Sequence, residues 1–199
     1  MKKEHLAVIT EQLGVEPVFI NSSLVSAQNR QRYYWANWQI TQPADKGIVL
    51  ADILECGEVD RDKAFCIDAN YHKGGNPEQY FNKSRRQLVF KPAAIVGRKL
   101  DENGSRNDTL EQKPVQCLEV QSHGKSRCLS TVAKDAVISP LEPGRYPKST
   151  AYRKLTPIEC ERLQTVPDNY TAHVSNTQRY KMLGNGWTVD VIAHIFRQL

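Results

Sequence analysis

Two arginines and a glutamine recur at every second position of one short segment. Gln28, Arg30 and Arg32 lie within residues 22–35, and an aromatic run, Tyr33-Tyr34-Trp35, follows them directly. In an extended segment, residues two apart point to the same side, so this spacing predicts that the three side chains converge on one spot. Guanidinium and amide groups suit the binding of a flat polar or anionic ligand. A solvated basic strand end is the other interpretation of the same spacing.

A helix and a strand precede this segment and would position it. Residues 3–13 carry an apolar stripe at helical spacing, Leu6, Ile9 and Leu13, and Gly14 is suited to end the helix. Residues 17–20 then read as a short buried strand. A helix, a tight turn and a strand form the closing half of a βαβ unit. An open α/β sheet cannot begin there, so the preceding strand is expected to lie outside this sequence.

The middle of the chain has a different character. From about residue 41 to 150, Gly, Pro, Asn and Ser recur between short apolar runs. These runs predict strands joined by turns, without a strong helical period, at residues 47–53, 64–67, 87–90, 93–96 and 115–120. The polar residues 101–108 predict a plain surface loop.

Helices are predicted again after residue 151. Thr156 can cap a helix that Pro157 opens, with Glu159 completing a capping box. Ser175-Asn176 predict the start of a second helix, which runs to about Leu183 and is broken by the glycines of residues 184–186. A last helix is expected from Thr188, with its apolar residues on one face: Val189, Ile192, Ile195, Phe196 and Leu199.

Composition limits the class of protein. The chain has 199 residues and a formal net charge of +5, which mildly favours an anionic partner. No apolar run approaches the length of a membrane span, and the N-terminus does not resemble a signal peptide. The five cysteines are odd in number and form no Cys-x-x-Cys pair, so we expect a reduced, intracellular protein without a zinc site or other metal.

Three segments together resemble the DNA cytosine-5 methyltransferases. The first is Ser22 to Trp35, the second is Arg153 to Tyr170, and the third is Tyr180 to Val189, around a Gly-Asn-Gly turn. They occur in the order of that family, and the long gap between the first and the second lies where the family carries its target-recognition domain. The resemblance covers residues 1–42 and 151–199, and residues 43–150 are assigned to that domain by position.

The resemblance implies a fold and a division into domains. We expect an α/β fold, the C-terminal part of a Rossmann-like S-adenosylmethionine-dependent methyltransferase domain with an inserted, mainly β target-recognition domain. Residues 1–42 would belong to the methyltransferase core, residues 43–150 would recognise DNA, and residues 151–199 would return to the core. The implied setting is the cytoplasm of a bacterium, or a phage-encoded protein, in a context such as restriction-modification.

The resemblance also implies site residues. Arg30 and Arg32 would act at the flipped target base, with Arg32 contacting it and Arg30 and Gln28 holding neighbouring loops or backbone. Alone, a Gly-Asn-Gly turn is only a turn; by position in the family, Asn185, Gly186 and Trp187 would line the pocket for S-adenosylmethionine. The turn is expected to present free backbone N–H groups to the cofactor.

Double-stranded DNA is the expected partner of the middle region. Basic residues gather there with aromatic neighbours, and phosphate contacts from them would position the duplex. The residues assigned to DNA binding, together with Gln28 of the first segment, are Lys73, Lys83, Arg85 and Arg86. A basic solvated surface is the alternative interpretation.

The family's catalytic groups have no counterpart in the sequence. Its nucleophile is a cysteine that follows a proline, but the residues before the five cysteines are Glu55, Phe65, Gln116, Arg127 and Glu159. A Glu-Asn-Val stretch and the glycine-rich turn that holds the cofactor are also absent. We therefore expect this chain alone to be inactive and to need a separate N-terminal methyltransferase half. The apolar face of the last helix and the edge of the sheet would be exposed without it.

Two other interpretations remain open at this point. The chain could be a non-catalytic DNA-binding or partner-binding module retained from a truncated methyltransferase. It could also be an unfolded fragment without activity.

Overall fold

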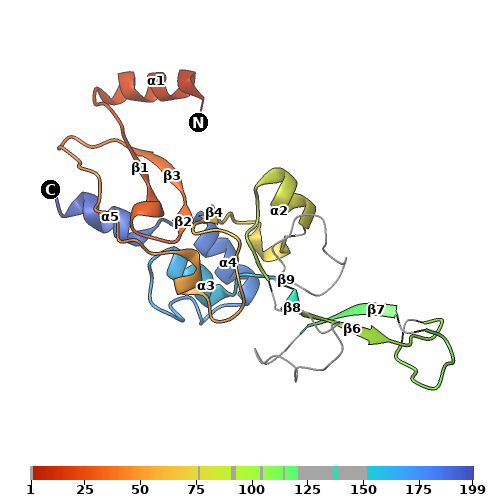
Figure 1. Ribbon diagram of the computed structural model, residues 1–199. Helices are drawn as coiled ribbons and strands as arrows, with labels where there is room; N and C mark the ends of the chain where they lie inside the picture. The colour runs from red at the N-terminus through yellow and green to blue at the C-terminus, as the bar shows by residue number, and fades with distance from the viewer. Residues whose placement is uncertain are drawn as a thin grey trace. The chain divides into compact units, whose positions relative to one another are not determined.

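The computed structural model describes residues 2–75, 77–90, 93–103, 105–113, 115–120, 137–138 and 152–199. The chain divides into two compact units. Unit 1 comprises Met1–Glu55, Arg61–Leu88 and Lys154–Leu199, and unit 2 comprises Cys56–Asp60 and Val89–Arg153. Each unit is described separately below (Figure 1).

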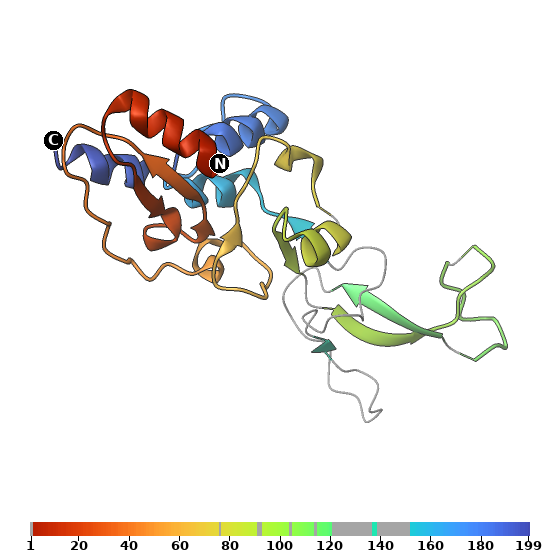
Figure 2. The same cartoon turned by 90° about the horizontal axis from the view of Figure 1, so that it is seen from above.

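Unit 1 begins with the predicted helix and strand. Helix α1 spans Lys3–Leu13, which confirms the predicted helix. It ends at Gly14, whose φ of 66° is the left-handed conformation that glycine adopts readily. Strand β1, Val18–Asn21, pairs antiparallel with β3, Gln31–Tyr34, and Val18 lies opposite Tyr34. Between them the 3-10 turn η1, Ser22–Leu24, is capped by the Asn21 side chain, which accepts from the Ser23 N–H. Figure 2 shows the two strands side by side.

The segment after β3 differs in part from the expected strands. Strand β4, Ala64–Phe65, pairs in parallel with β2, Gln28–Asn29, which joins this segment to the arginine-rich one. The expected strand at residues 47–53 is wrong, because residues Leu50–Ile53 form the 3-10 turn η2. There Asp52 Oδ2 accepts from the Val49 N–H at 2.8 Å, which favours a turn over extended backbone.

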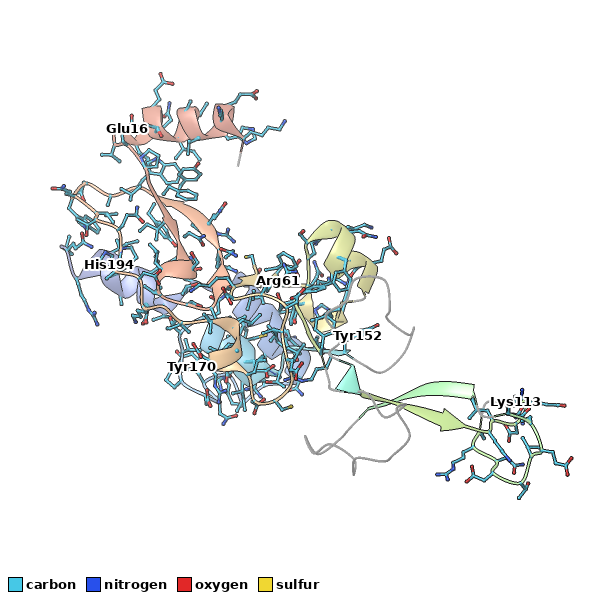
Figure 3. The ribbon with its side chains drawn as sticks, in the orientation of Figure 1. Glu16, Arg61, Lys113, Tyr152, Tyr170 and His194 are labelled. Carbon is cyan, nitrogen blue, oxygen red and sulfur yellow. The ribbon has the colours of Figure 1, made fainter. Side chains whose placement is uncertain are left out.

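A short helix was not expected in this region. Helix α2 spans Pro77–Lys83 and follows the 3-10 turn η3, Tyr71–Lys73. Seven residues give fewer than two helical turns, too few for an apolar period to be recognised. In Figure 3 the labelled Arg61 lies beside α2, where its Nε donates to the Tyr80 hydroxyl at 2.8 Å.

The predicted C-terminal helices of unit 1 are confirmed. Helix α3, Pro157–Leu163, has both halves of the Thr156–Glu159 capping box. Helix α4, Asn176–Asn185, starts at Ser175, whose hydroxyl accepts from the Gln178 N–H. Helix α5, Val189–Phe196, follows Thr188 but receives no side-chain cap from it.

The core of the N-terminal part of unit 1 joins β1 to α5. Its buried residues are Ile20, Val25, Ile40, Val191 and Ile195. The expectation of an exposed apolar face on the last helix is therefore right only in part. Val189, Phe196 and Leu199 are exposed, whereas Ile195 is buried because it faces this cluster.

Unit 2 contains an antiparallel sheet. Strands β6, Ala93–Arg98, and β7, Val115–Val120, pair along their whole length, and β8, Val137–Ile138, pairs with the other edge of β6. These positions confirm the strands expected at residues 93–96 and 115–120. Between β6 and β7 lies the expected polar loop, where Asp101 Oδ1 accepts from the N–H groups of Asn103 and Ser105. Lys113 lies on the same connection (Figure 3).

Strands β5, Leu88–Phe90, and β9, Tyr152–Lys154, pair with each other where the chain leaves unit 1 and returns to it. These units are divided by compactness alone, and the functional domain boundary expected at residue 43 stays a prediction. Residues 43–55 and 61–88 belong to unit 1, because their backbone pairs with β2 and packs against α3 and α4.

Candidate functional site

The three residues of the Gln28-x-Arg30-x-Arg32 pattern do not form one surface cluster. Gln28 and Arg30 are buried, at 0% and 6% exposure, whereas Arg32 is exposed. The reason is that Arg30 lies between two strands with different partners, since β2 pairs with β4 and β3 pairs with β1. The alternation of buried and exposed residues therefore breaks at Arg32, and of the three residues only Arg32 is accessible to a ligand.

Gln28 holds the backbone of unit 1 together. Its side-chain amide donates to the Leu163 carbonyl at 2.8 Å and to Gln164 Oε1 at 3.1 Å, and Ser26 donates to the same carbonyl at 2.6 Å. These bonds satisfy the end of α3. The assignment of Gln28 to DNA binding does not agree with this geometry, because a fully buried amide that is hydrogen-bonded within the chain has no face for DNA.

Arg30 clamps two segments that are distant in sequence. Its Nη1 donates to the Ile67 carbonyl at 2.9 Å, and its Nη2 donates to the carbonyls of Gly184 and Gly186 at 3.1 and 2.7 Å. Nη1 also lies 3.3 Å from the Sγ of Cys66. A buried guanidinium needs such acceptors, and here they fix the Gly-Asn-Gly turn to the segment after β4. Arg30 therefore holds neighbouring backbone and has no free face for a base.

Arg32 is the accessible member of the pattern. Its Nη1 donates to the Gln31 carbonyl at 2.7 Å, and its Nη2 lies 3.9 Å from the Sγ of Cys66. Burial raises the pKa of the neighbouring Tyr34 hydroxyl, and the positive charges of Arg32 and Arg30 offset part of that rise. Tyr34 is thus neutral at physiological pH and leaves the charge of Arg32 available to a ligand.

Gly184 and Asn185 of the expected Gly-Asn-Gly turn are the last two residues of α4, and Gly186 follows them before α5. Gly184 is required there, because a Cβ at this position would lie 2.2 Å from the backbone of Asp68. Asn185 is exposed, and Trp187 has 67% of its surface exposed. The expectation of free backbone N–H groups is wrong for Gly186, whose N–H donates to the Met182 carbonyl at 2.7 Å. The first N–H groups of α5 also have partners, Gln164 for Val189 and Thr165 for Asp190.

A largely apolar pocket of about 490 Å³ lies in unit 1 between β3, the segment after it and α5. Arg32 and Trp187 both line it, so the pocket brings together one residue expected at the target base and one expected at the cofactor. The other lining residues are aromatic or aliphatic: Leu13, Tyr33, Tyr34, Trp35, Ala36, Trp38, Ile40, Ile192, Ile195 and Phe196.

The four basic residues assigned to DNA binding lie together in sequence around α2, and all belong to unit 1. Lys73 is exposed, and Lys83 lies 3.7 Å from Glu78 in an exposed ion pair. Arg85 pairs with Asp68 at 3.2 Å and keeps 60% of its side chain exposed. Arg86 instead donates to the Gly74 carbonyl at 2.8 Å, which fixes its loop. Lys73, Lys83 and Arg85 are therefore the members that a phosphate can reach.

Cys160 offers no activated nucleophile. Burial raises the pKa of the Cys160 thiol well above its usual value, with a further rise from Glu159. Cys160 is therefore inert in the core of α3. Cys56 is exposed in unit 2 and Cys66 is half-buried beside Arg30. In the same described ranges, no group of three or more His, Cys, Asp or Glu side chains could hold a metal ion.

Two residues at this site were not anticipated. Cys66 and Asp68 follow β4. Cys66 contacts both Arg30 and Arg32, and Asp68 pairs with Arg85. They lie 34 or more residues from the arginine pattern, and nothing in the sequence connects them to it. Only the pairing of β4 with β2 brings them there.

No helix in the described part of the chain is long and apolar enough to cross a membrane.

Comparison with known proteins gives a match to one family model. Residues 22–199 match the model described as C-5 cytosine-specific DNA methylase. The match runs through both units and includes the arginine pattern, Cys66 and the Gly-Asn-Gly turn.

Individual relatives match shorter stretches. An orphan methyltransferase of Bacillus phage SPR, M.SPRI, is 46% identical over 61 residues, which are 28% of this chain and 14% of the relative. The type II methyltransferase M.HhaI of Haemophilus parahaemolyticus is 31% identical over 99 residues, which are 45% of this chain and 30% of the relative. The matches thus span less than a third of each of these relatives. Among solved structures, a methyltransferase of Entamoeba histolytica, EhMeth, aligns over 98% of this chain and 56% of that chain, with a TM-score of 0.47 and 13% identity.

Proposed function

The chain belongs to the C-5 cytosine-specific DNA methylase family, and we propose that it supplies the base-contacting arginine, DNA contacts and part of the cofactor pocket of a DNA (cytosine-5)-methyltransferase. Family membership supports an α/β methyltransferase fold. The observation that carries the proposal is that Arg32 and Trp187 line the same pocket, while Arg30 joins their two segments by hydrogen bonds.

Arg32 contacts the target cytosine in this proposal. Its guanidinium is exposed at the pocket, and a planar donor of this kind suits the acceptor atoms of a base. The target carbon of cytosine is hidden within a stacked duplex, so the base must be extruded before it reaches the pocket. Arg30 and Gln28 maintain the backbone on which Arg32 stands.

S-adenosylmethionine supplies the methyl group when it is bound. The residues present fit part of such a ligand, because the exposed indole of Trp187 offers a flat apolar surface beside an apolar pocket and Asn185 adds an exposed amide. Asn185, Gly186 and Trp187 are the proposed cofactor-binding residues. The N–H of Gly186 is already used within the chain, so its part is to give the turn its shape.

DNA is held by the exposed basic residues around α2. Lys73, Lys83 and Arg85 contact phosphates and position the duplex, and such contacts weaken with salt. Arg86 fixes the loop that carries them. The strands of unit 2 and these basic residues all fall within residues 43–150, the proposed target-recognition domain.

The attacking thiol comes from a segment other than residues 1–199, because none of the five cysteines here follows a proline. This segment carries a Pro-Cys loop and, in this proposal, is a separate N-terminal half of the enzyme. The chain alone is then inactive. The exposed apolar residues Val189, Phe196 and Leu199 form part of the surface on which that half packs.

Complementation is the direct test. We expect this chain, mixed with a separately produced segment carrying the Pro-Cys loop, to transfer tritiated methyl groups from S-adenosylmethionine to duplex DNA. The chain alone transfers none. Substitution Arg32→Ala in the mixture lowers the rate at least tenfold while the far-ultraviolet circular dichroism is unchanged. A folded, associated mixture without methyl transfer contradicts the proposal.

A second candidate is a non-catalytic DNA-binding module. The inert environment of Cys160 and the lack of a Pro-Cys pair favour it. It predicts that the chain alone binds duplex DNA with an affinity that falls steeply with salt, and that added S-adenosylmethionine changes nothing. Binding that requires the cofactor or the second segment decides for the methyltransferase.

A further inference from the structure

Cys66 lies between the two arginines of the pattern. Its Sγ accepts from Nη1 of Arg30 at 3.3 Å and from Nη2 of Arg32 at 3.9 Å. A thiol is a weak acceptor, so these contacts orient the guanidinium groups more than they bind them tightly. Arg32 depends more on such orientation, because it has one backbone carbonyl as a partner, that of Gln31, whereas Arg30 has three.

The segment that carries this thiol is fixed on both sides. Ile67, the next residue, accepts from Arg30 through its carbonyl at 2.9 Å and donates through its N–H to Gln28 Oε1 at 3.5 Å. The backbone of Asp68 approaches Gly184 so closely that a Cβ there would lie 2.2 Å away. Cys66 therefore stands on a rigid base between the buried arginine segment and the end of α4.

Arg32 is the other arginine that contacts the Cys66 sulfur, and its side chain is exposed. An exposed arginine has many rotamers, and a ligand must fix one of them when it binds. A contact to a fixed sulfur favours one orientation in advance. This orientation keeps the guanidinium at the pocket that Trp187 also lines.

We propose that Cys66 is a positioning residue that holds Arg32 toward the target cytosine, and that Arg30 links this position to the Gly184–Gly186 turn. The inference rests on the proposed function of Arg32. Cys66 contacts neither the base nor the cofactor and acts through Arg32. Loss of its Sγ therefore weakens recognition of an extruded base without changing the phosphate contacts.

The test measures binding of this chain to two fluorescent duplex pools of random sequence, one fully paired and one with a single unpaired cytosine. The ratio of the two affinities reports contact with an accessible base. We expect Arg32→Ala to lower this ratio about tenfold and Cys66→Ala about threefold. The double variant should be no worse than Arg32→Ala alone, because the two residues act through one guanidinium. The salt dependence of binding should stay unchanged in all three variants.

Cys56→Ala is the matched control, since Cys56 also has its Sγ near an arginine, 3.8 Å from Nη2 of Arg153, and is expected to leave the ratio unchanged. If Cys66→Ala lowers the melting temperature, Cys66→Val, which fills the space of the thiol with an apolar side chain that has no acceptor, takes its place. Additive losses in the double variant, or a ratio unaffected by both Cys66 variants, overturn the positioning role. A ratio unaffected by Arg32→Ala overturns instead the proposed base contact on which it rests.

Discussion

At the scale of single residues, Arg30 and Arg32 carry the same charged group in opposite environments. Arg30 is 6% exposed and donates to three backbone carbonyls, whereas Arg32 is exposed at the pocket. Removing a guanidinium from water is costly unless acceptors replace the water. Arg30 therefore serves the fold of unit 1, and the same substitution should have different consequences at the two positions.

Arg30→Ala should lower the free energy of unfolding by about 3 kcal/mol, because it leaves buried carbonyls of Ile67, Gly184 and Gly186 without their donor. Arg32→Ala is the control and should change it by less than about 0.5 kcal/mol, since its side chain is exposed. Urea titration followed by circular dichroism measures both. Equal effects of the two substitutions would contradict the clamp assigned to Arg30.

At the scale of elements, local signals predicted the helices well and the site only in part. The capping box at Thr156 and the left-handed Gly14 are local, so the sequence alone indicates both helix ends. Arg30 is buried and Arg32 is exposed because the strands on the two sides of Arg30 pair with different partners. The pairing of β2 with β4 joins residues that are 36 positions apart in the sequence. The contact of Cys66 with both arginines could not be predicted for the same reason.

The junction of α3 and α4 has an ion pair in its interior, and its stability should depend on pH. Burial raises the pKa of Glu161, but hydrogen bonds from Thr171, Arg179 and Asn169 outweigh this, so the pKa lies below its usual range. A lowered folded-state pKa means that the stabilisation is complete above the ordinary glutamate pKa of about 4.3 and is lost as pH falls through the folded value. When melting temperatures are measured from pH 7 to pH 3, they should therefore decrease once the pH is lower than about 4.

Glu161→Gln should flatten the acid limb of that profile and destabilise the fold at pH 7 by about 2–4 kcal/mol, because Arg179 keeps a buried charge without its partner. Asp168→Asn, which removes an ion pair with Arg162 at the surface, serves as the matched control and should cost under about 1 kcal/mol. An acid limb that persists unchanged in Glu161→Gln would show that another carboxylate is responsible.

Gly184 of α4 lies directly against the backbone of the segment after β4. Gly184→Ala should destabilise unit 1 by more than about 3 kcal/mol, because its Cβ would overlap the backbone of Asp68 and Ala69. Gly14→Ala places a Cβ in open space at a φ of 66°, so its cost should stay near about 1 kcal/mol. Thermal melts compare the two, and a mild effect at Gly184 would mean that the two segments can separate.

At the scale of the whole molecule, unit 1 carries several large apolar side chains that are exposed. Large side chains with more than half of their surface exposed include Val8, Leu13, Trp187, Phe196 and Leu199. Exposed apolar groups of this size promote association, and burying one stabilises a complex by roughly 1.5–3 kcal/mol. This surface agrees with the proposal that a further segment of the methyltransferase core packs on unit 1.

The double substitution Phe196→Ser and Leu199→Ser should therefore reduce self-association of the isolated chain while leaving its melting temperature within about 2 °C, because neither side chain is buried. Sedimentation velocity at rising protein concentration measures the association. Tyr170→Ser is the control, since Tyr170 is 63% exposed on the loop after α3 and lies outside the pocket lining. If the surface receives the segment with the Pro-Cys loop, the same double variant should also bind that segment at least tenfold more weakly. Reduced self-association with undiminished complementation would place the packing surface elsewhere on unit 1.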